Sequence, residues 1–202
     1  MPHLCTAANV NLCICTALCK RAERINILIA LKKITHQNLC ECIYDIETTE
    51  EQKGFVDSNV ESLAEAYASI TNGGFATPYA VYNDDIMIGF VMYTFFDRAD
   101  AVDISDPQTA PESYKSSPCY YIWRILIDRN QQGKGYGKQA IAKIIDEIKT
   151  MPYGKADRIY TSWAPDNIAS KMLFESFGFV ETGEVDGSLE EGDYEIVVRL
   201  DI

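Results

Sequence analysis

The sequence has no apolar run approaching the roughly 20 residues that a membrane-spanning helix needs. Basic residues are scarce: 18 Lys and Arg stand against 30 Asp and Glu, which gives a formal net charge of −12. This charge argues against binding to nucleic acid or to an anionic membrane, and it is compatible with a cationic substrate. Internal repeats and a linker within residues 24–202 are also absent, so we expect a single domain there.

The seven cysteines do not suggest a disulfide framework, because their number is odd and they cluster early in the chain. We interpret them as reduced thiols of a cytoplasmic protein. Residues 1–23 contain Cys5, Cys13, Cys15 and Cys19, and we expect a poorly ordered extension ahead of the domain. Zinc binding by these thiols is a less favoured alternative, because the spacing lacks the usual CxxC pair, and we expect no metal.

A glycine-rich turn lies between a predicted strand and a predicted helix. The strand, Tyr120–Ile127, is aromatic and β-branched. Glycines at 133, 135 and 137 allow close approach of the backbone to a ligand, and a helix N-terminus adds unpaired N–H donors. The turn therefore has the construction of a phosphate-binding loop. The helix that follows has one isoleucine-rich face, formed by Ile141, Ile144, Ile145 and Ile148.

The spacing of the glycines distinguishes among phosphate-binding loops. The Walker spacing GxxxxGK(S/T) and the dinucleotide spacing GxGxxG are both absent. The run Gln132-Gly133-Lys134-Gly135-Tyr136-Gly137 instead matches (R/Q)xxGx(G/A). It resembles the pyrophosphate loop of the GNAT superfamily of acetyl-CoA-dependent N-acetyltransferases. A second block, residues 167–179, resembles the NxxAxxxYxxxGF helix of that family, with Ser170 in the alanine place.

The resemblance covers residues 24–202 and implies an α/β (α+β) fold, with a mixed, twisted sheet of about seven strands and helices on both faces. The pattern of residues predicts strands at 25–31, 79–82, 86–96, 120–127, 158–163, 179–185 and 194–200. It also predicts a long polar loop at 97–118.

Two helices are predicted between the first two strands. Thr35 can cap the first, whose apolar face is Leu39, Ile43 and Ile46. A capping box formed by Ser58 and Glu61 opens the second. We expect Leu63, Tyr67 and Ile70 to point inward from this second helix.

The resemblance also implies how acetyl-CoA, the acetyl donor, is held. Strand backbone before the loop binds the pantetheine arm, N–H groups of the loop bind the pyrophosphate, Asn167 binds pantetheine, and Phe174 lies near the acetyl sulfur. Asn167 can serve at once as an ordinary helix N-cap. The implied set is Ile125, Leu126, Ile127, Gln132, Gly133, Lys134, Gly135, Tyr136, Gly137, Lys138, Asn167 and Phe174.

Phe174 departs from the family pattern, because many relatives have a tyrosine there that protonates the departing thiolate. A thiol with a pKa near ~8.5 can leave as its anion if helix N-termini stabilise it, so turnover does not require that tyrosine. Tyr160 and Tyr136 are candidates to take its place. An acetyl-CoA-binding module with little turnover is the alternative that Phe174 leaves open.

The acceptor is expected to be a primary amine. The acidic loop around Glu50 and Glu51 can attract a cationic amine and pass its proton to water, although a solvated charged loop is an equal alternative. Together with Trp123 and Arg124, which border the acceptor or pack the sheet, this loop resembles the diamine and spermidine/spermine acetyltransferase group. An amino acid, an aminoglycoside or a protein N-terminus is the alternative acceptor, and a homodimer is possible.

Overall fold

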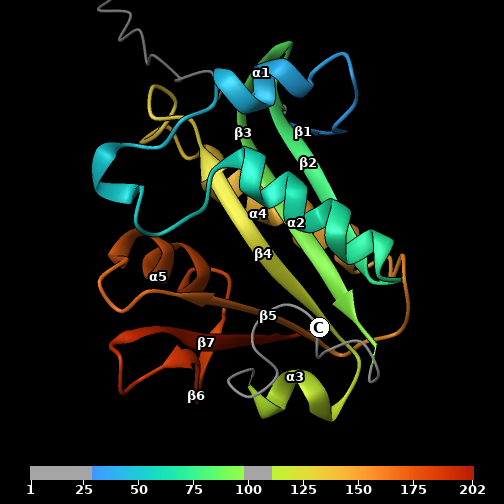
Figure 1. The fold of residues 1–202 in the computed structure, drawn as a ribbon, viewed down its shortest axis with the longest axis vertical. Helices are drawn as coiled ribbons and strands as arrows, with labels where there is room; N and C mark the ends of the chain where they lie inside the picture. The colour runs from blue at the N-terminus through green and yellow to red at the C-terminus, as the bar shows by residue number, and fades with distance from the viewer. Residues whose placement is uncertain (1–28, 98–110) are drawn as a thin grey trace, which may run out of the picture.

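The computed structural model describes residues 29–97 and 111–202, and a single mixed sheet of seven strands organises them (Figure 1). The strand order is β1-β2-β3-β4-β5-β7-β6, in which β4 and β5 are parallel and every other neighbouring pair is antiparallel. The expected fold class is confirmed. The strands are β1 Ile29–Lys33, β2 Phe75–Asn83, β3 Ile86–Phe96, β4 Cys119–Ile127, β5 Arg158–Trp163, β6 Val180–Ser188 and β7 Asp193–Asp201.

Helices cover both faces of this sheet, as expected. Figure 1 shows α2 in front of the strands and α4 behind them. No helix within the described residues is long and apolar enough to cross a bilayer. The helices are α1 Leu39–Tyr44, the 3-10 helix η1 Glu50–Gln52, α2 Asn59–Thr71, α3 Glu112–Ser116, α4 Tyr136–Ile148 and α5 Ile168–Glu175.

Each face of the sheet has its own apolar core. On one face the predicted isoleucines of α4 are buried, and they pack with Phe174 of α5 against inward-facing strand residues. On the other face Cys42 of α1 and Ala66 of α2 pack against Phe90 and Met92 of β3. The main force that holds both helical layers on the strands is the burial of apolar surface, which contributes about 25 cal/mol of free energy for each Å² buried.

The start of α2 confirms the predicted capping box, but of the predicted inward residues only Leu63 packs against the core. Ser58 accepts from the N–H of Glu61, and the Glu61 carboxylate accepts from the N–H of Ser58. Tyr67 and Ile70 are 74% and 54% exposed, so their predicted burial is wrong. Small and polar residues face the sheet in their place: Asn59, Ser62 and Ala66. They let the helix lie close to the strands, and the Asn59 amide donates to the Cys42 carbonyl at 2.7 Å.

Several element boundaries also differ from expectation. The first helix begins at Leu39, because Thr35 opens a turn in which its N–H donates to Asn38 Oδ1 at 2.7 Å. Strand β2 begins at Phe75 and includes Pro78, which lies past the last residue that β1 pairs with and so needs no donor on that side. Helix α3 lies within the predicted 97–118 loop. Residues 98–110 of that loop, the start of the first predicted strand and the N-terminal cysteines lie outside the described residues.

The two parallel strands diverge soon after they meet. Strands β4 and β5 pair only at Tyr120 with Ile159 and at Tyr121 with Tyr160. In β4, Arg124 pairs with Met92 while Ile122 pairs with Tyr93, so Trp123 is an extra, bulged residue. Just beyond the paired residues, Thr161 Oγ1 donates to the Ile122 carbonyl at 2.9 Å and links the two strands where they begin to separate. The gap between the strands therefore widens toward the C-terminal end of β4.

Candidate active site

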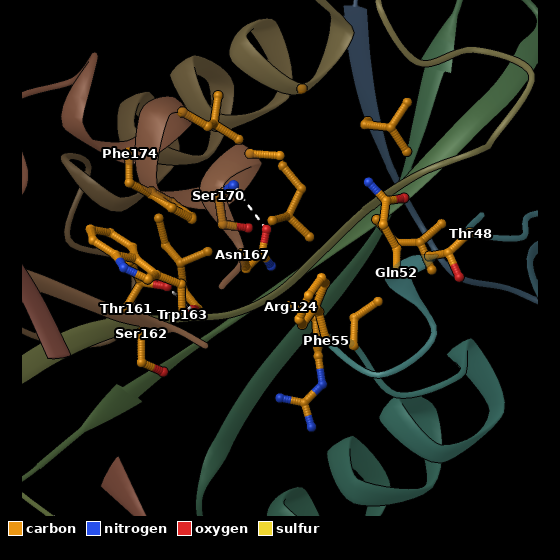
Figure 2. Close-up of a pocket in the computed structure, with 18 of the residues that line it drawn as sticks. Thr48, Gln52, Phe55, Arg124, Thr161, Ser162, Trp163, Asn167, Ser170 and Phe174 are labelled. Carbon is orange, nitrogen blue, oxygen red and sulfur yellow. Dashed lines mark hydrogen bonds between the residues drawn. The ribbon is translucent and has the colours of Figure 1, made fainter. Parts of the chain in front are cut away.

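A cavity of about 810 Å³ occupies the region where β4 and β5 diverge. Its walls come from β4, the glycine loop, α5, the segment 48–57 and the β6–β7 hairpin. Figure 2 shows Trp163 and Phe174 on one side of this space, with Arg124, Phe55 and Gln52 across from them. The cavity thus joins the cofactor-binding residues implied by the sequence to a second wall, the acceptor-side wall, which is expected from the sequence to border the acceptor.

The glycine loop has the backbone geometry that phosphate binding requires. Gly133 and Gly135 have φ values of 74° and 79°, and Gly135 is the residue that precedes α4. Such values are rare for residues with a Cβ atom. Within the described chain no oxygen accepts from the backbone N–H groups of Gly133, Gly135 or Gly137. These free donors at a helix N-terminus fit an acetyl-CoA pyrophosphate.

Gln132 fixes the loop to both neighbouring walls of the cavity. Its Nε2 donates to the Ile127 carbonyl at 2.9 Å and to Gln52 Oε1 at 2.7 Å. Arg129, which follows β4, is also bonded to Glu47, which precedes η1. The Arg129 N–H donates to the Glu47 carbonyl at 2.8 Å, and its guanidinium pairs with the Glu47 carboxylate at 3.1 Å. The segment before η1 is thereby held against the C-terminal end of β4.

The residues implied for the cofactor arm meet at this cavity. All of them line it except Lys134, whose Nζ donates to the Asn130 carbonyl at 3.0 Å and to Gln131 Oε1 at 2.8 Å. Asn167 is the N-cap of α5 and its Oδ1 accepts from the N–H of Ser170 at 3.1 Å. That bond leaves the amide NH2 of Asn167 available to a ligand.

Phe174 is 2% exposed and its ring packs between two other aromatic rings. It stacks on Trp163 with ring centroids 6.3 Å apart, and it meets Phe179 edge to face at 5.2 Å. Trp163 also lines the cavity, and its buried Nε1–H has no hydrogen-bond acceptor within the described chain. A buried donor without an acceptor is costly, so this indole is a feature that a bound ligand can satisfy.

The two candidate tyrosines occupy different environments. Tyr136 lines the cavity at the first residue of α4, and its hydroxyl accepts from Asn83 Nδ2 at 3.1 Å. Tyr160 is 1% exposed, packs edge to face on Tyr114 at 5.3 Å, and does not line the cavity. Of the two, only Tyr136 is placed beside the cofactor residues.

Arg124 organises one part of the acceptor-side wall. Its guanidinium contacts the Asp57 carboxylate, pairs with Glu65 Oε2 at 3.1 Å, and lies over the Trp123 ring at 5.5 Å. Burial raises the pKa of Glu65, and the positive charge of Arg124 opposes that effect. The guanidinium is therefore already neutralised by carboxylates of the protein, while both Trp123 and Arg124 still border the cavity.

Glu50 and Glu51, the acidic residues singled out in the sequence, do not line the cavity. Glu50 pairs with Lys53 at 2.6 Å on η1, and its side chain is 76% exposed. The same loop contributes Gln52, Phe55 and Asp57 to the wall instead. The loop named from the sequence therefore does line the cavity, but through residues other than Glu50 and Glu51.

A second acidic wall was missed altogether, because it comes from the C-terminal hairpin. Asp186 of β6 pairs with Glu195 of β7, and Asp193 lies two residues before Glu195. The alternation of acidic and apolar residues along 193–197 was a signal that one face of this strand carries carboxylates. The hairpin residues that line the cavity are Asp186, Gly187, Asp193, Tyr194 and Glu195.

Comparison with known proteins identifies the family. Residues 40–179 match the model of the Acetyltransferase (GNAT) family. The chain is 28% identical over 160 residues to the Spermine/spermidine N(1)-acetyltransferase of Bacillus subtilis (strain 168), covering 78% of this chain and 91% of that protein. A Probable spermine N(1)-acetyltransferase of Bacillus subtilis subsp. natto matches with the same identity and coverage.

Solved structures agree with this result at the level of the fold. The crystal structure of aminoglycoside acetyltransferase AAC(6')-Ib in complex with coenzyme A superposes with a TM-score of 0.60 at 16% identity, covering 86% of this chain and 95% of that one. An acetyltransferase from Thermus thermophilus superposes with a TM-score of 0.56 at 14% identity, covering 87% and 99%. The chain belongs to the GNAT family and is an N-acetyltransferase that uses acetyl-CoA as its acetyl donor.

Proposed function

We propose that the acceptor is a diamine or polyamine, acetylated on a primary amino group by direct attack in a ternary complex. The observation that carries this proposal is the acidic lining of the cavity beyond the cofactor residues, where Asp186, Asp193 and Glu195 of the β6–β7 hairpin line the same space. A flexible polycation gains favourable electrostatic energy from several carboxylates at once. The names of the two Bacillus relatives support the same acceptor class.

The bound thioester supplies an activated acetyl group, and the protein supplies position and charge. Loop N–H groups at 133–138 hold the pyrophosphate, and the β4 backbone at Ile125–Ile127 holds the pantetheine arm beside Asn167. The acceptor enters from the acidic wall as an ammonium and loses a proton to water. Its neutral nitrogen attacks the carbonyl carbon, the carbon–sulfur bond breaks, and the nitrogen gives up a second proton to water or to the departing sulfur as the amide forms, with no covalent intermediate on the protein.

The chain offers two ways for the sulfur to leave. Either Tyr136 protonates it, since its hydroxyl accepts from the Asn83 amide and keeps its own proton, or the sulfur leaves as a thiolate. The second way needs no side chain with a dissociable proton beside Phe174. We favour thiolate departure, because Phe174 and Trp163, the aromatic residues at that place, have no such proton.

Thiol release from acetyl-CoA over a panel of amines tests the function. Spermine, spermidine and 1,4-diaminobutane represent the proposed class, and kanamycin, lysine and a peptide N-terminus represent the alternatives. We expect kcat/KM at least ~100-fold higher for the best polyamine than for lysine or the peptide. A preference for kanamycin or the peptide would reject a polyamine acceptor while leaving the acetyltransferase activity in place.

A further inference from the structure

The C-terminal hairpin places a hydrogen-bonded chain of three side chains at the acceptor side of the cavity. Tyr121 of β4 and Ser162 of β5 lie 2.7 Å apart between their oxygens, and the Ser162 hydroxyl donates to the Glu195 carboxylate of β7. A serine hydroxyl has a single proton, so Tyr121 must be the donor to Ser162. The donors therefore run in one direction, from the buried Tyr121 to the carboxylate that lines the cavity.

These two hydrogen bonds hold the Glu195 carboxylate in a fixed place, where it serves as the final acceptor. Burial raises the pKa of Tyr121, and the negative charges of Glu195 and Asp186 add to that effect, so the phenol stays a donor. Within the described chain no lysine, arginine or histidine pairs with Glu195. Glu195 differs in this respect from Arg124, whose positive charge is already paired with the carboxylates of Asp57 and Glu65.

The strand register adds a second, independent observation. Asp186 and Glu195 are directly opposite each other in the β6–β7 pair, and both line the cavity. Like charges directly opposite each other destabilise a sheet. Asp193, two residues from Glu195, adds a third carboxylate to the same space. A cation bound there lies close to carboxylates from both strands of the hairpin.

The chemistry of the reaction decides which cation belongs beside Glu195. An amine attacks only as the neutral base, and a carboxylate within a few Å stabilises the ammonium and raises its pKa. A carboxylate at the reacting nitrogen would therefore have to remove this proton as a general base as well as attract the ammonium. The same carboxylate favours the reaction when it holds an ammonium elsewhere in the acceptor, because it then contributes binding energy and leaves the attacking nitrogen free to lose its proton.

Resting on the proposed function, we propose that Glu195 is the specificity-determining residue that binds the second, non-reacting ammonium group of a diamine or polyamine. Ser162 and Tyr121 are positioning residues that act through the Glu195 carboxylate. Acceptors with a single amino group lack the group that Glu195 binds, so the enzyme discriminates against them at this residue.

Paired acceptors of the same chain length test the proposal: 1,4-diaminobutane and 1-aminobutane, with thiol release measured on the full chain. We expect Glu195→Gln to lower kcat/KM for the diamine at least tenfold, about 1.4 kcal/mol, and for the monoamine less than twofold. Most of the loss should appear in KM. Ser162→Ala should show the same selective loss to a smaller degree, while acetyl-CoA affinity stays unchanged in both variants.

Glu191→Gln is the matched control, because it removes the same charge from the same hairpin at an exposed residue that does not line the cavity. Equal losses for the diamine and the monoamine would place Glu195 at the reacting nitrogen and overturn the proposal. Equal kinetics for Glu195→Gln and Glu191→Gln would overturn it as well. If the wild type acetylates neither amine, calorimetric measurement of 1,4-diaminobutane binding in the presence of coenzyme A provides a separate test.

In that case, binding by the wild type that Glu195→Gln weakens tenfold would support the role of Glu195 while rejecting the proposed acceptor activity. Binding that Glu195→Gln leaves unchanged, or an absence of binding in the wild type, would reject the role of Glu195.

Discussion

The indole of Trp163 stacks on the phenyl ring of Phe174, with centroids 6.3 Å apart and planes inclined by only 15°. Both rings line the cavity, yet neither has a proton that it can give to a departing thiolate. The family position that often carries an acid is therefore part of an aromatic wall in this chain. This relationship leads to two predictions, one for each ring.

For Phe174, we expect the wild type to turn over and Phe174→Tyr to keep acetyl-CoA affinity while it preserves or raises the rate. General acid catalysis typically raises the rate ~10²–10⁴-fold where it operates, so removal of an essential acid elsewhere would cause an easily measured loss of rate. Thiol release with one good amine compares Phe174→Tyr, Tyr136→Phe and Tyr160→Phe with the wild type. Loss of most of the rate in Tyr136→Phe would assign the acid to that residue. Activity that appears only in Phe174→Tyr would show that the wild type mainly binds acetyl-CoA.

For Trp163, we expect its unpaired Nε1–H to bond to bound acetyl-CoA. Trp163→Phe should weaken acetyl-CoA binding about fivefold, about 1 kcal/mol, in calorimetry. Phe179→Leu is the control, because it removes aromatic packing from the same cluster at a residue that does not line the cavity. Affinities that fall equally in the two variants would attribute the effect to packing and not to the indole donor.

For the glycine loop, Gly135→Val should reduce acetyl-CoA affinity at least tenfold, about 1.4 kcal/mol. The φ of 79° at Gly135 disfavours a β-branched residue, and a distorted loop turns its N–H groups away from the pyrophosphate. Gly73→Val is matched to it, since Gly73 has a φ of 92° and open space around it but lies outside the cavity. That control should lose stability and keep its affinity; unchanged affinity in a folded Gly135→Val would contradict the assignment of the loop.

For Arg124, we expect Arg124→Gln to destabilise the fold by about 1 kcal/mol at pH 7, because the partly exposed Asp57 and Glu65 lose their counter-ion. Burial already raises the pKa of Glu65, and loss of Arg124 raises it further. A raised carboxyl pKa means that protonation favours the folded state, so the penalty should shrink as the pH falls below the raised folded pKa of Glu65. Denaturant unfolding at pH 7 and at pH 4 measures the difference.

Lys53→Gln is the control for Arg124→Gln, because it breaks an exposed pair with Glu50 and should cost no more than a few tenths of a kcal/mol. A penalty for Arg124→Gln that is as large at pH 4 as at pH 7 would assign it to lost packing against Trp123 instead of lost charge.

The elements with strong local signals were predictable from the sequence. The isoleucine face of α4 and the capping box of Ser58 and Glu61 appear as expected, because both depend on residues three or four apart in the chain. The orientation of α2 was not predictable in the same way. Its exposed Tyr67 depends on which side of the helix meets β2 and β3, and no local pattern reports that contact.

The same distinction between local signals and contacts of distant segments applies to the site. The proposed cofactor half comes from the end of β4, the loop that follows it and α5, so local motifs were enough to name residues that line the cavity there. The acceptor half joins Asp57, Arg124, Ser162 and Glu195 from four separate segments, and only the strand register brings them together. Glu50 and Glu51 were named because they lie in an acidic loop between two predicted helices, but the turn of η1 directs the adjacent Gln52 inward instead.

The brief pairing of β4 with β5 has a consequence for how this enzyme can change its acceptor. The proposed cofactor-binding groups come mainly from β4, the glycine loop and α5, whereas much of the proposed acceptor wall comes from β6 and β7. Strands β1–β4 and strands β5–β7 therefore form two hydrogen-bonded groups that are joined at only two residue pairs. We expect substitutions on the β6–β7 hairpin to change which amine is accepted with little effect on acetyl-CoA binding.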